Sequence, residues 1–502
     1  MMLSTGNKSR TFYPAMILCL GLWVAQVIAT LQVYLSNIDF HRTLSLIKAN
    51  GYVTVPSELI ADRLLAFTPA FVGGLFFTCS IGAGLSLFTL GAVWCWDRLF
   101  NRNRIVFGIL VLLWLACVAG VNWNGFSPLV TLYVVILPVF VSVVSLKWIR
   151  RGTHQEQRVR PWGHVIPVIV LALLWTSQQT GSFFLDIRDN LLLTNSWGTA
   201  FSDRYYEYTL YPARVIKPLG RKTLKTYTLS GIKKESEASG IQQNLLHQDY
   251  LPVPDGSSAD LDIVRKDTDL VFYHRHRSVL KMMQEEFSAD PVGALKRVSS
   301  KSDRHHVFRQ LIYISLLLGF PLALYVLLYA LLRFVCSFCM SVGAASIAAS
   351  ALCCLIGLSL FFLFQHHRKP PVAPRDIPAA LASEHWQDKV AALKTISRKA
   401  MELDGSLTHL KLSNSPHIPV RYWLAKALAT DRKPDTVNHL VALLDDPNPN
   451  VICMALASLG RQKDRAVVGT IINVIETSDH WYVQDYAYRA LRRLGWTQTK
   501  SK

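Results

Sequence analysis

Long apolar runs are the feature that most restricts what this chain can fold into. A helix of about 20 predominantly apolar residues crosses the hydrocarbon core of a bilayer, because its backbone amides are then paired within the segment. Seven stretches qualify, namely residues 14–35, 65–94, 105–121, 129–146, 165–184, 311–332 and 342–364. The sequence therefore predicts a polytopic helical membrane protein. In the second run, Gly82 and Gly84 should let a neighbouring helix approach closely.

The composition agrees with this interpretation. Hydrophobic residues make up 51% of the chain and charged residues 17%, whereas an ordinary soluble domain has about 25% charged residues. None of the nine cysteines lies between Asp186 and His306. This distribution excludes a small secreted scaffold held together by disulfides.

Basic residues in the short connections predict the orientation. Eleven of them fall on one side of the predicted spans, namely Lys8, Arg10, Arg98, Arg102, Arg104, Lys147, Arg150, Arg151, Arg158, Arg160 and Arg333. The opposing short loops hold only Arg42, Lys48 and Arg63. Because positive charge favours the cytoplasm, we expect a bacterial inner-membrane protein with a cytoplasmic N-terminus. Seven crossings then place residues 185–306 and the C-terminal region outside the cytoplasm.

The fifth run decides this side assignment, since its removal would reverse it. Residues 176–180 are polar, and they mark either the exit of the helix into water or a polar pocket between spans. The predicted organisation is a membrane domain of five spans (1–184), a small extramembrane α+β domain (185–306), a hairpin of two spans (307–365) and a C-terminal helical domain (366–502).

The extramembrane insert shows mixed local patterns. Residues 205–211 and 270–276 are rich in strand-favouring types, and residues 279–287 can place their apolar groups on one helical face. Residues 184–193 could form an interfacial amphipathic segment, in which Arg188 pairs with a carboxylate or a lipid phosphate. The alternative is an ordinary helix with a solvated face.

A repeat of about 30 residues marks the C-terminal region. Apolar residues recur at a spacing of four in three triplets, Val420–Leu424–Leu428, Val451–Ala455–Leu459 and Val483–Ala487–Leu491. A weaker match begins at Val390. Each triplet lies along one side of a helix, and a period of this length accommodates two helices with their turns. Stacking such pairs would create one continuous core.

These residues resemble HEAT-like repeats, particularly those of phycobilisome-lyase-like arrays, over about residues 376–497. The resemblance is carried by residues 443–451, 455–460 and 487–495, in which Asp445 and Asp446 begin a turn before Pro447 and Gly460 and Gly495 can terminate helices. It implies a C-terminal α-solenoid and, because such arrays usually bind proteins, a scaffold or docking role. It does not imply lyase activity, since no cofactor-attachment constellation accompanies the repeat.

Aromatic residues near the last repeat are the candidate partner-binding residues. Trp481, Tyr482 and Tyr486 could anchor a protein interface. The same residues could instead pack against the last helix near Trp496, as aromatic side chains serve both purposes.

Cys336 and Cys339 are the candidate catalytic residues of a second hypothesis. Two cysteines separated by two residues can form a reversible disulfide, and the stretch from Gly319 to Cys339 resembles membrane thiol oxidoreductases of the vitamin K epoxide reductase type. The predicted orientation turns this pair toward the cytoplasm, and no other loop supplies a shuttle pair. Packing as small hydrophobic residues is the alternative.

A transporter is the third hypothesis, with Gln178 and Gln179 as candidate pathway residues, although the spans hold almost no ionisable groups. Nucleic-acid binding is disfavoured, because much of the net charge of +19 lies in connections beside apolar runs. We expect no cofactor and no metal. The fold class is thus mainly α: a polytopic membrane protein with an α+β insert and a HEAT-like solenoid, whose partners are the bilayer and a docked protein.

Overall fold

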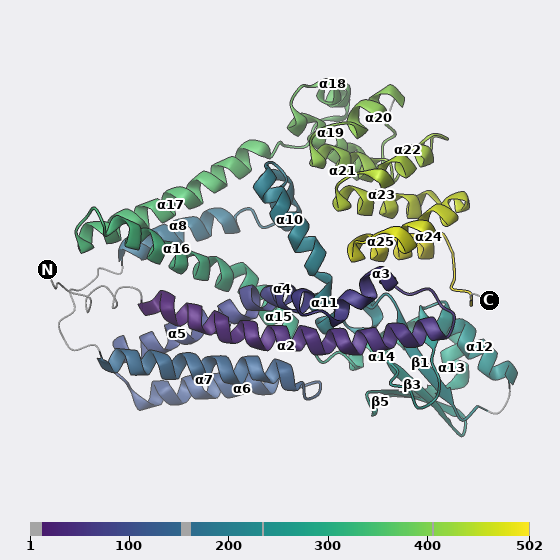
Figure 1. The fold of residues 1–502 in the computed structure, drawn as a ribbon, viewed down its shortest axis with the longest axis horizontal. Helices are drawn as coiled ribbons and strands as arrows, with labels where there is room; N and C mark the ends of the chain where they lie inside the picture. The colour runs from purple at the N-terminus through teal and green to yellow at the C-terminus, as the bar shows by residue number, and fades with distance from the viewer. Residues whose placement is uncertain (1–12, 152–161, 233–234, 404–405, 501–502) are drawn as a thin grey trace.

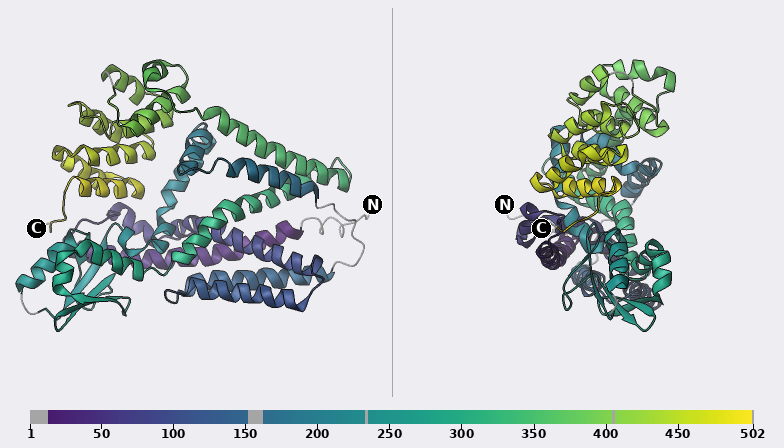
Figure 2. Two further views of the ribbon diagram at one scale, coloured as in Figure 1. Left: turned by 180° about the vertical axis from the view of Figure 1, so that it is seen from behind. Right: turned by 90° about the vertical axis from the view of Figure 1, so that its right-hand side faces the viewer.

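A computed structural model describes residues 13–151, 162–232, 235–403 and 406–500. The described chain is mainly helical, with 72% helix and one small sheet. The apolar helices extend to one end of the molecule, while the sheet and the C-terminal helices lie side by side at the other end (Figures 1 and 2). The predicted loop residues Lys8, Arg10, Arg158 and Arg160 lie outside the described residues.

Six helices in the described residues are long and apolar enough to cross a membrane. They are α2 (Tyr13–Ala49), the α4–η2–α5 helix (Phe67–Phe77, Thr78–Gly82 and Ala83–Arg98), α6 (Arg104–Val121), α7 (Pro128–Arg151), the α15–η5–α16 helix (His306–Ile314, Ser315–Gly319 and Phe320–Cys336) and α17 (Val342–His367). At 1.5 Å per residue, α2 is about 55 Å long. It therefore extends well beyond the predicted end at residue 35, toward the sheet and the C-terminal helices (Figure 1).

The fifth predicted span is shorter than the prediction of residues 165–184. Helix α8 (Trp162–Thr176) ends where the polar residues begin, and its apolar part is too short to count among the six. Six such helices replace the predicted seven. Helix α8 nevertheless runs beside α17 and in the same direction (Figure 1). The connection around residues 99–103, which contains Arg102 and follows Arg98, and the connection around residues 337–341, which follows Arg333 in the last turn of α16, lie at the end opposite the C-terminal helices (Figure 1).

Two π-helical turns, η2 and η5, meet inside this bundle. The Ser315 hydroxyl donates a hydrogen bond to the Ser80 carbonyl oxygen. A Cβ added to Gly319 would lie 2.7 Å from the Cα of Gly84. The small residue at position 84 thus permits the close approach that the sequence predicted.

A stem of short helices connects α8 to the sheet. It comprises α9 (Phe183–Ile187), η3 (Arg188–Leu192), α10 (Ser196–Tyr208), α11 (Leu210–Ile216) and η4 (Leu219–Arg221). The strand prediction for residues 205–211 was wrong, because this segment is the end of α10 and the start of α11. Helix α11 packs against α2 and α4, so tertiary contacts outweighed the local β-propensity of the tyrosines.

The α+β domain contains a five-stranded mixed sheet of order β2-β1-β3-β4-β5. The elements are β1 (Lys225–Ser230), α12 (Glu235–Leu246), β2 (Tyr250–Pro252), β3 (Leu261–Lys266), β4 (Asp269–His274), β5 (Arg277–Met283), α13 (Gln284–Ala289) and α14 (Pro291–Lys301). Strand β1 is parallel to β2 and β3, and the other pairs are antiparallel. Residues 279–283 belong to β5, so the helix predicted from residue 279 begins only at Gln284.

The C-terminal region is helical throughout its described part, apart from turns. It contains η6 (Pro374–Asp376), α18 (Ile377–Ala382), α19 (Trp386–Lys399), α20 (Ser406–Ser413), α21 (Ile418–Ala427), α22 (Thr436–Ala442), η7 (Leu443–Asp445), α23 (Pro449–Gln462), η8 (Arg465–Val467), α24 (Val468–Thr477) and α25 (Trp481–Arg493). Helices α19, α21, α23 and α25 pack one against the next. The short helices α18, α20, α22 and α24 lie mainly along the outer side of this row (Figure 1).

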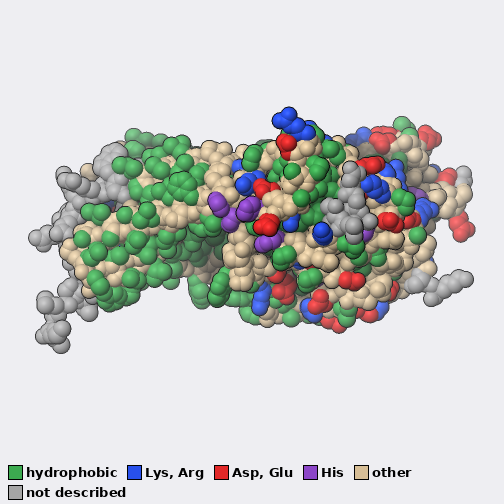
Figure 3. All heavy atoms as spheres, turned by 90° about the horizontal axis from the view of Figure 1, so that it is seen from above, with side chains coloured by type: hydrophobic (Ala, Val, Ile, Leu, Met, Phe, Trp, Pro, Cys, Tyr) green, Lys and Arg blue, Asp and Glu red, His purple; other side chains and the backbone are tan. Residues whose placement is uncertain are grey.

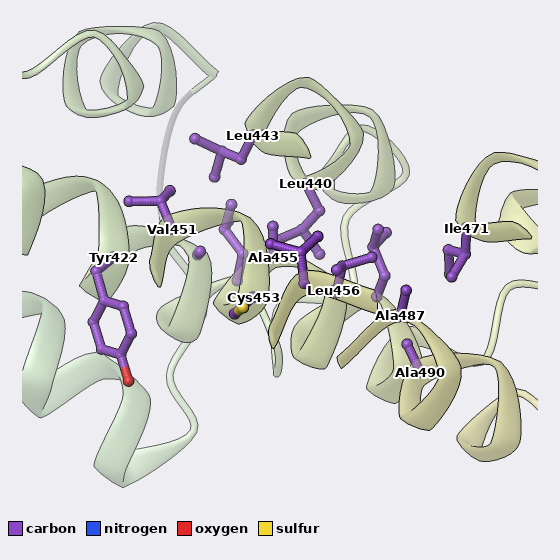
Figure 4. Packing of buried hydrophobic residues seen from close by; sticks show 14 of the residues in the cluster. Tyr422, Leu440, Leu443, Val451, Cys453, Ala455, Leu456, Ile471, Ala487 and Ala490 are labelled. Carbon is purple, nitrogen blue, oxygen red and sulfur yellow. The ribbon is translucent and has the colours of Figure 1, made fainter. Parts of the chain in front are cut away.

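The predicted apolar triplets form the core of this region. Ala455 of α23 and Ala487 of α25 are fully buried in one cluster with Leu440 of α22, and Figure 4 shows these side chains in close packing. Gly460 does not terminate a helix as predicted, because α23 continues to Gln462 and ends at Lys463 with a positive φ of 62°. A Cβ at Gly460 would lie 2.9 Å from the Cα of Ala490, so the glycine permits close contact between α23 and α25.

Candidate functional site

We call helices α19, α21, α23 and α25 the inner row of the C-terminal region. The stem packs against this inner row and forms a junction with it. We define the stem junction as Asp186, Arg188 and Asp189 of the stem with Lys394 of α19 and Trp423 of α21. The three stem residues are buried. Their backbone is held by α9 and by the π-helical turn η3, which also contacts α17.

Arg188 and Asp189 form a buried ion pair at its centre. The Nε and Nη2 atoms of Arg188 donate to Oδ1 of Asp189 over 3.0 and 2.8 Å. The guanidinium carbon lies 4.0 Å from the ring centre of Tyr422. Burial opposes the charge of Arg188, but the Asp189 carboxylate together with Tyr422 and Tyr206 raises the arginine pKa overall. The sequence left open whether Arg188 meets a carboxylate, a lipid or water, and the structure gives it a carboxylate.

The remaining junction contacts join the stem directly to the inner helices. Trp423 Nε1 donates to Oδ2 of Asp189 over 2.8 Å, and Lys394 Nζ lies 3.1 Å from Oδ1 of Asp186. Lys394 also lies 5.0 Å from the Trp423 ring centre. Two carboxylates thus meet two cations, and every charge at the junction has a partner within the chain.

The candidate partner-binding aromatics lie beside this junction and pack against the same chain. Trp481 is only 8% exposed, with ring-centre distances of 5.1 Å to Tyr211 and 5.6 Å to Phe40. Tyr482 lies 5.3 Å from Tyr206 of the stem. Tyr486 stacks on Tyr482 at 5.5 Å. Their role toward an external partner stays a prediction.

Helix α25 also contacts the segment that follows α2, at Ser57, and the sheet domain. The Gln484 side chain exchanges hydrogen bonds with the backbone and the hydroxyl of Ser57, at 2.8 and 2.7 Å. The Tyr488 hydroxyl donates to Asp249 over 2.7 Å, and Arg492 lies 2.8 Å from the same carboxylate. Sequence reasoning missed these contacts, because each joins residues more than 200 positions apart and no periodic pattern marks them.

The residues of the two other hypotheses lie elsewhere. Cys336 ends α16 and Cys339 follows in the turn before α17, far from the stem junction (Figure 1), and both are free thiols. Gln178 accepts a hydrogen bond from Arg368 over 2.9 Å, just beyond the ends of α8 and α17. Within the described residues, no cluster of three or more His, Cys, Asp or Glu residues could hold a metal ion.

The stem junction can therefore hold two parts of the molecule together, because its charged groups pair with one another. No curated protein and no solved structure matches the chain. Residues 408–492 match the family model of HEAT repeats. This part of the C-terminal region is a HEAT repeat segment, as the spacing of its apolar triplets and its resemblance to such repeats predicted.

Proposed function

We propose that this chain is an integral membrane scaffold whose HEAT repeats dock a protein partner. The HEAT match on a chain with six apolar helices carries the proposal. HEAT repeats generally mediate protein interactions, and the stacked helix pairs are consistent with an α-solenoid built from such repeats.

The surface of the apolar helices supports embedding in a membrane. Only 6% of the 18 residues of α6 are buried within the protein, and Leu112 and Leu113 are both more than 60% exposed. Figure 3 shows hydrophobic side chains over the half formed by the apolar helices and charged side chains gathered on the other half. An exposed apolar surface of this extent is unfavourable in water and favourable in lipid.

In the proposed orientation α8 crosses beside α17 although it is shorter than the six other helices, so the N-terminus stays in the cytoplasm and both the sheet domain and the HEAT repeats lie on the other side. The positions of the basic connections support it, as they lie at the end opposite these two regions (Figure 1). A reporter enzyme fused after Lys502 tests this directly. It should be active only on the non-cytoplasmic side, and activity in the cytoplasm would overturn the orientation.

The outer helices are the proposed docking side, because the stem occupies part of the inner row. Leu410 of α20 is 51% exposed and gives a position to test. The full chain carrying Leu410→Glu should lose a stoichiometric partner that the unchanged chain retains after extraction from native membranes. Met283→Glu, at a similarly exposed residue of β5, is the matched control and should retain it. Equal recovery with both variants would contradict docking through this face.

A further inference from the structure

A large cavity lies where the stem, the sheet domain and the HEAT repeats meet. Its volume is about 990 Å³. Its wall includes residues of α10 and α11, of β1 and α14, and of α25, together with Phe76 from the apolar helix α4. The cavity therefore lies at the boundary between the apolar helices and the polar half of the molecule.

The cavity wall is strongly cationic. Six basic residues line it, namely Lys217, Arg221, Lys225, Lys296, Arg309 and Arg489. Only two carboxylates do so, and each already has a basic partner: Asp303 lies 2.9 Å from Arg309, and Asp485 lies 2.7 Å from Arg489. Among the described residues, the other four cations have no carboxylate oxygen within 4 Å.

Lys225 is the most deeply placed of these unpaired cations. Only 6% of it is exposed, and its Nζ lies 4.8 Å from the ring centre of Tyr250. Burial lowers its pKa to about 8, and burial also lowers the pKa of Lys217. Asp249 and Asp260 attract the Lys225 ammonium from more than 4 Å, but each is in contact with another cation, Arg492 and Lys222 respectively. A bound anion would therefore offset the remaining cost of burying this ammonium.

An exposed aromatic stripe leads into the same cavity. Trp197, Phe201 and Tyr205 of α10 are 87%, 63% and 47% exposed. Their spacing of four places them along one face of the helix. Helix α10 crosses from the end of α17 toward α4 (Figure 1), and Tyr205 itself lines the cavity. Exposed aromatic residues at the end of an apolar bundle are typical of the membrane interface.

We propose that this cavity binds an anionic, phosphate-bearing amphiphile. Lys217, Arg221 and Lys225 hold the phosphate group, and the aromatic stripe on α10 receives the acyl chains. The ligand is a lipid rather than free phosphate, because cationic and apolar groups converge on one opening. This inference goes beyond the scaffold role, since a docking protein needs no lipid in this position.

Native mass spectrometry of the full chain in detergent tests the proposal. Phosphatidylglycerol should bind in preference to phosphatidylcholine and with at least tenfold higher affinity than inorganic phosphate. Lys225→Met should weaken phosphatidylglycerol binding at least tenfold. Lys301→Met is the matched control, because Lys301 is exposed on α14 outside the cavity wall, and it should leave the affinity unchanged.

A second variant separates the two halves of the site. Phe201→Ala lies on the exposed surface of α10, so the fold should tolerate it, and it should weaken phospholipid binding severalfold without altering the binding of inorganic phosphate. Equal affinities for phosphatidylglycerol and inorganic phosphate would overturn the amphiphile assignment. Equal effects of Lys225→Met and Lys301→Met would overturn the cavity as the site.

Discussion

The stem junction and the cavity both contain buried charge, but only at the stem junction does each cation contact a carboxylate. At the stem junction, Arg188 meets Asp189 while Lys394 meets Asp186. In the cavity, Lys217 and Lys225 line the same wall, and within the described chain neither has a carboxylate oxygen within 4 Å. The same element, the stem, contributes to both.

This difference distinguishes a structural joint from a binding site. Charges that neutralise one another fix the geometry of the contact they share, since breaking the pair would leave an uncompensated ion in the interior. Cations with no carboxylate in direct contact can gain a contacting partner from a bound anion. The stem junction should therefore respond to substitution through stability, and the cavity through ligand binding.

A charged substitution in the core of the repeats should cause the largest loss of stability. Leu459 is fully buried in α23, so Leu459→Asp would place an unpaired charge in the core and cost about 4 kcal/mol or more. We expect the HEAT repeats to unfold while the apolar helices persist. Circular dichroism during thermal unfolding should show the loss as an early transition. A melting curve identical to that of the unchanged protein would contradict the assignment of this core.

Breaking the stem junction should have the next largest effect. Asp189→Asn leaves the Arg188 guanidinium buried without its counter-charge, at an expected cost of about 3–5 kcal/mol. The repeats themselves should stay folded but separate from the stem. A lowered Tm, together with new protease cleavage within residues 183–208, would report this separation.

Asp203→Asn is the matched control for that experiment. The Asp203 carboxylate is half-buried and accepts a hydrogen bond over 3.2 Å from the neutral side chain of Asn448, so its loss should cost less than about 1 kcal/mol. Similar Tm shifts for the two variants would mean that the ion pair has no special part in the junction.

The sequence predicted the C-terminal repeats best, because their apolar residues follow a single helical spacing. The triplet from Val451 to Leu459 forms a buried helical face in the structure, because each repeat packs mainly on its neighbours in sequence. The tyrosines of residues 205–211 were misassigned for the opposite reason. Their conformation is set by packing against α2 and α4, which are distant in sequence.

The candidate site was predictable only in outline. The charged character of the stem was visible, including Arg188 and the acids beside it, but the residue that completes the joint, Trp423, lies 234 positions from Asp189. The cavity wall draws its cations from residues 217–489. Single residues gathered from separate elements leave no spacing that a reader of the sequence could recognise.

Lys225→Met in the cavity should stabilise the lipid-free protein, whereas Leu459→Asp and Asp189→Asn should destabilise it. Burial lowers the pKa of Lys225 from its ordinary value of 10.5 to about 8, against the smaller opposing attraction of Asp249 and Asp260. Below pH 8 the ammonium is charged in both folded and unfolded chains, and its burial cost is fully present. Methionine removes that cost, and after the loss of the contact with Tyr250 we expect a net stabilisation on the order of 2 kcal/mol for the lipid-free protein.

The pH dependence of stability distinguishes removal of the Lys225 charge from a general effect of the substitution. Between pH 8 and 10.5 the unfolded chain binds more protons than the folded one, so the stability of the unchanged protein rises with pH. The advantage of Lys225→Met should therefore be largest below pH 8 and disappear near pH 10.5. Thermal unfolding of delipidated protein at pH 7 and pH 10 measures this difference. A variant less stable than the unchanged protein at pH 7 would place Lys225 with Arg188, among the charges that the chain itself compensates.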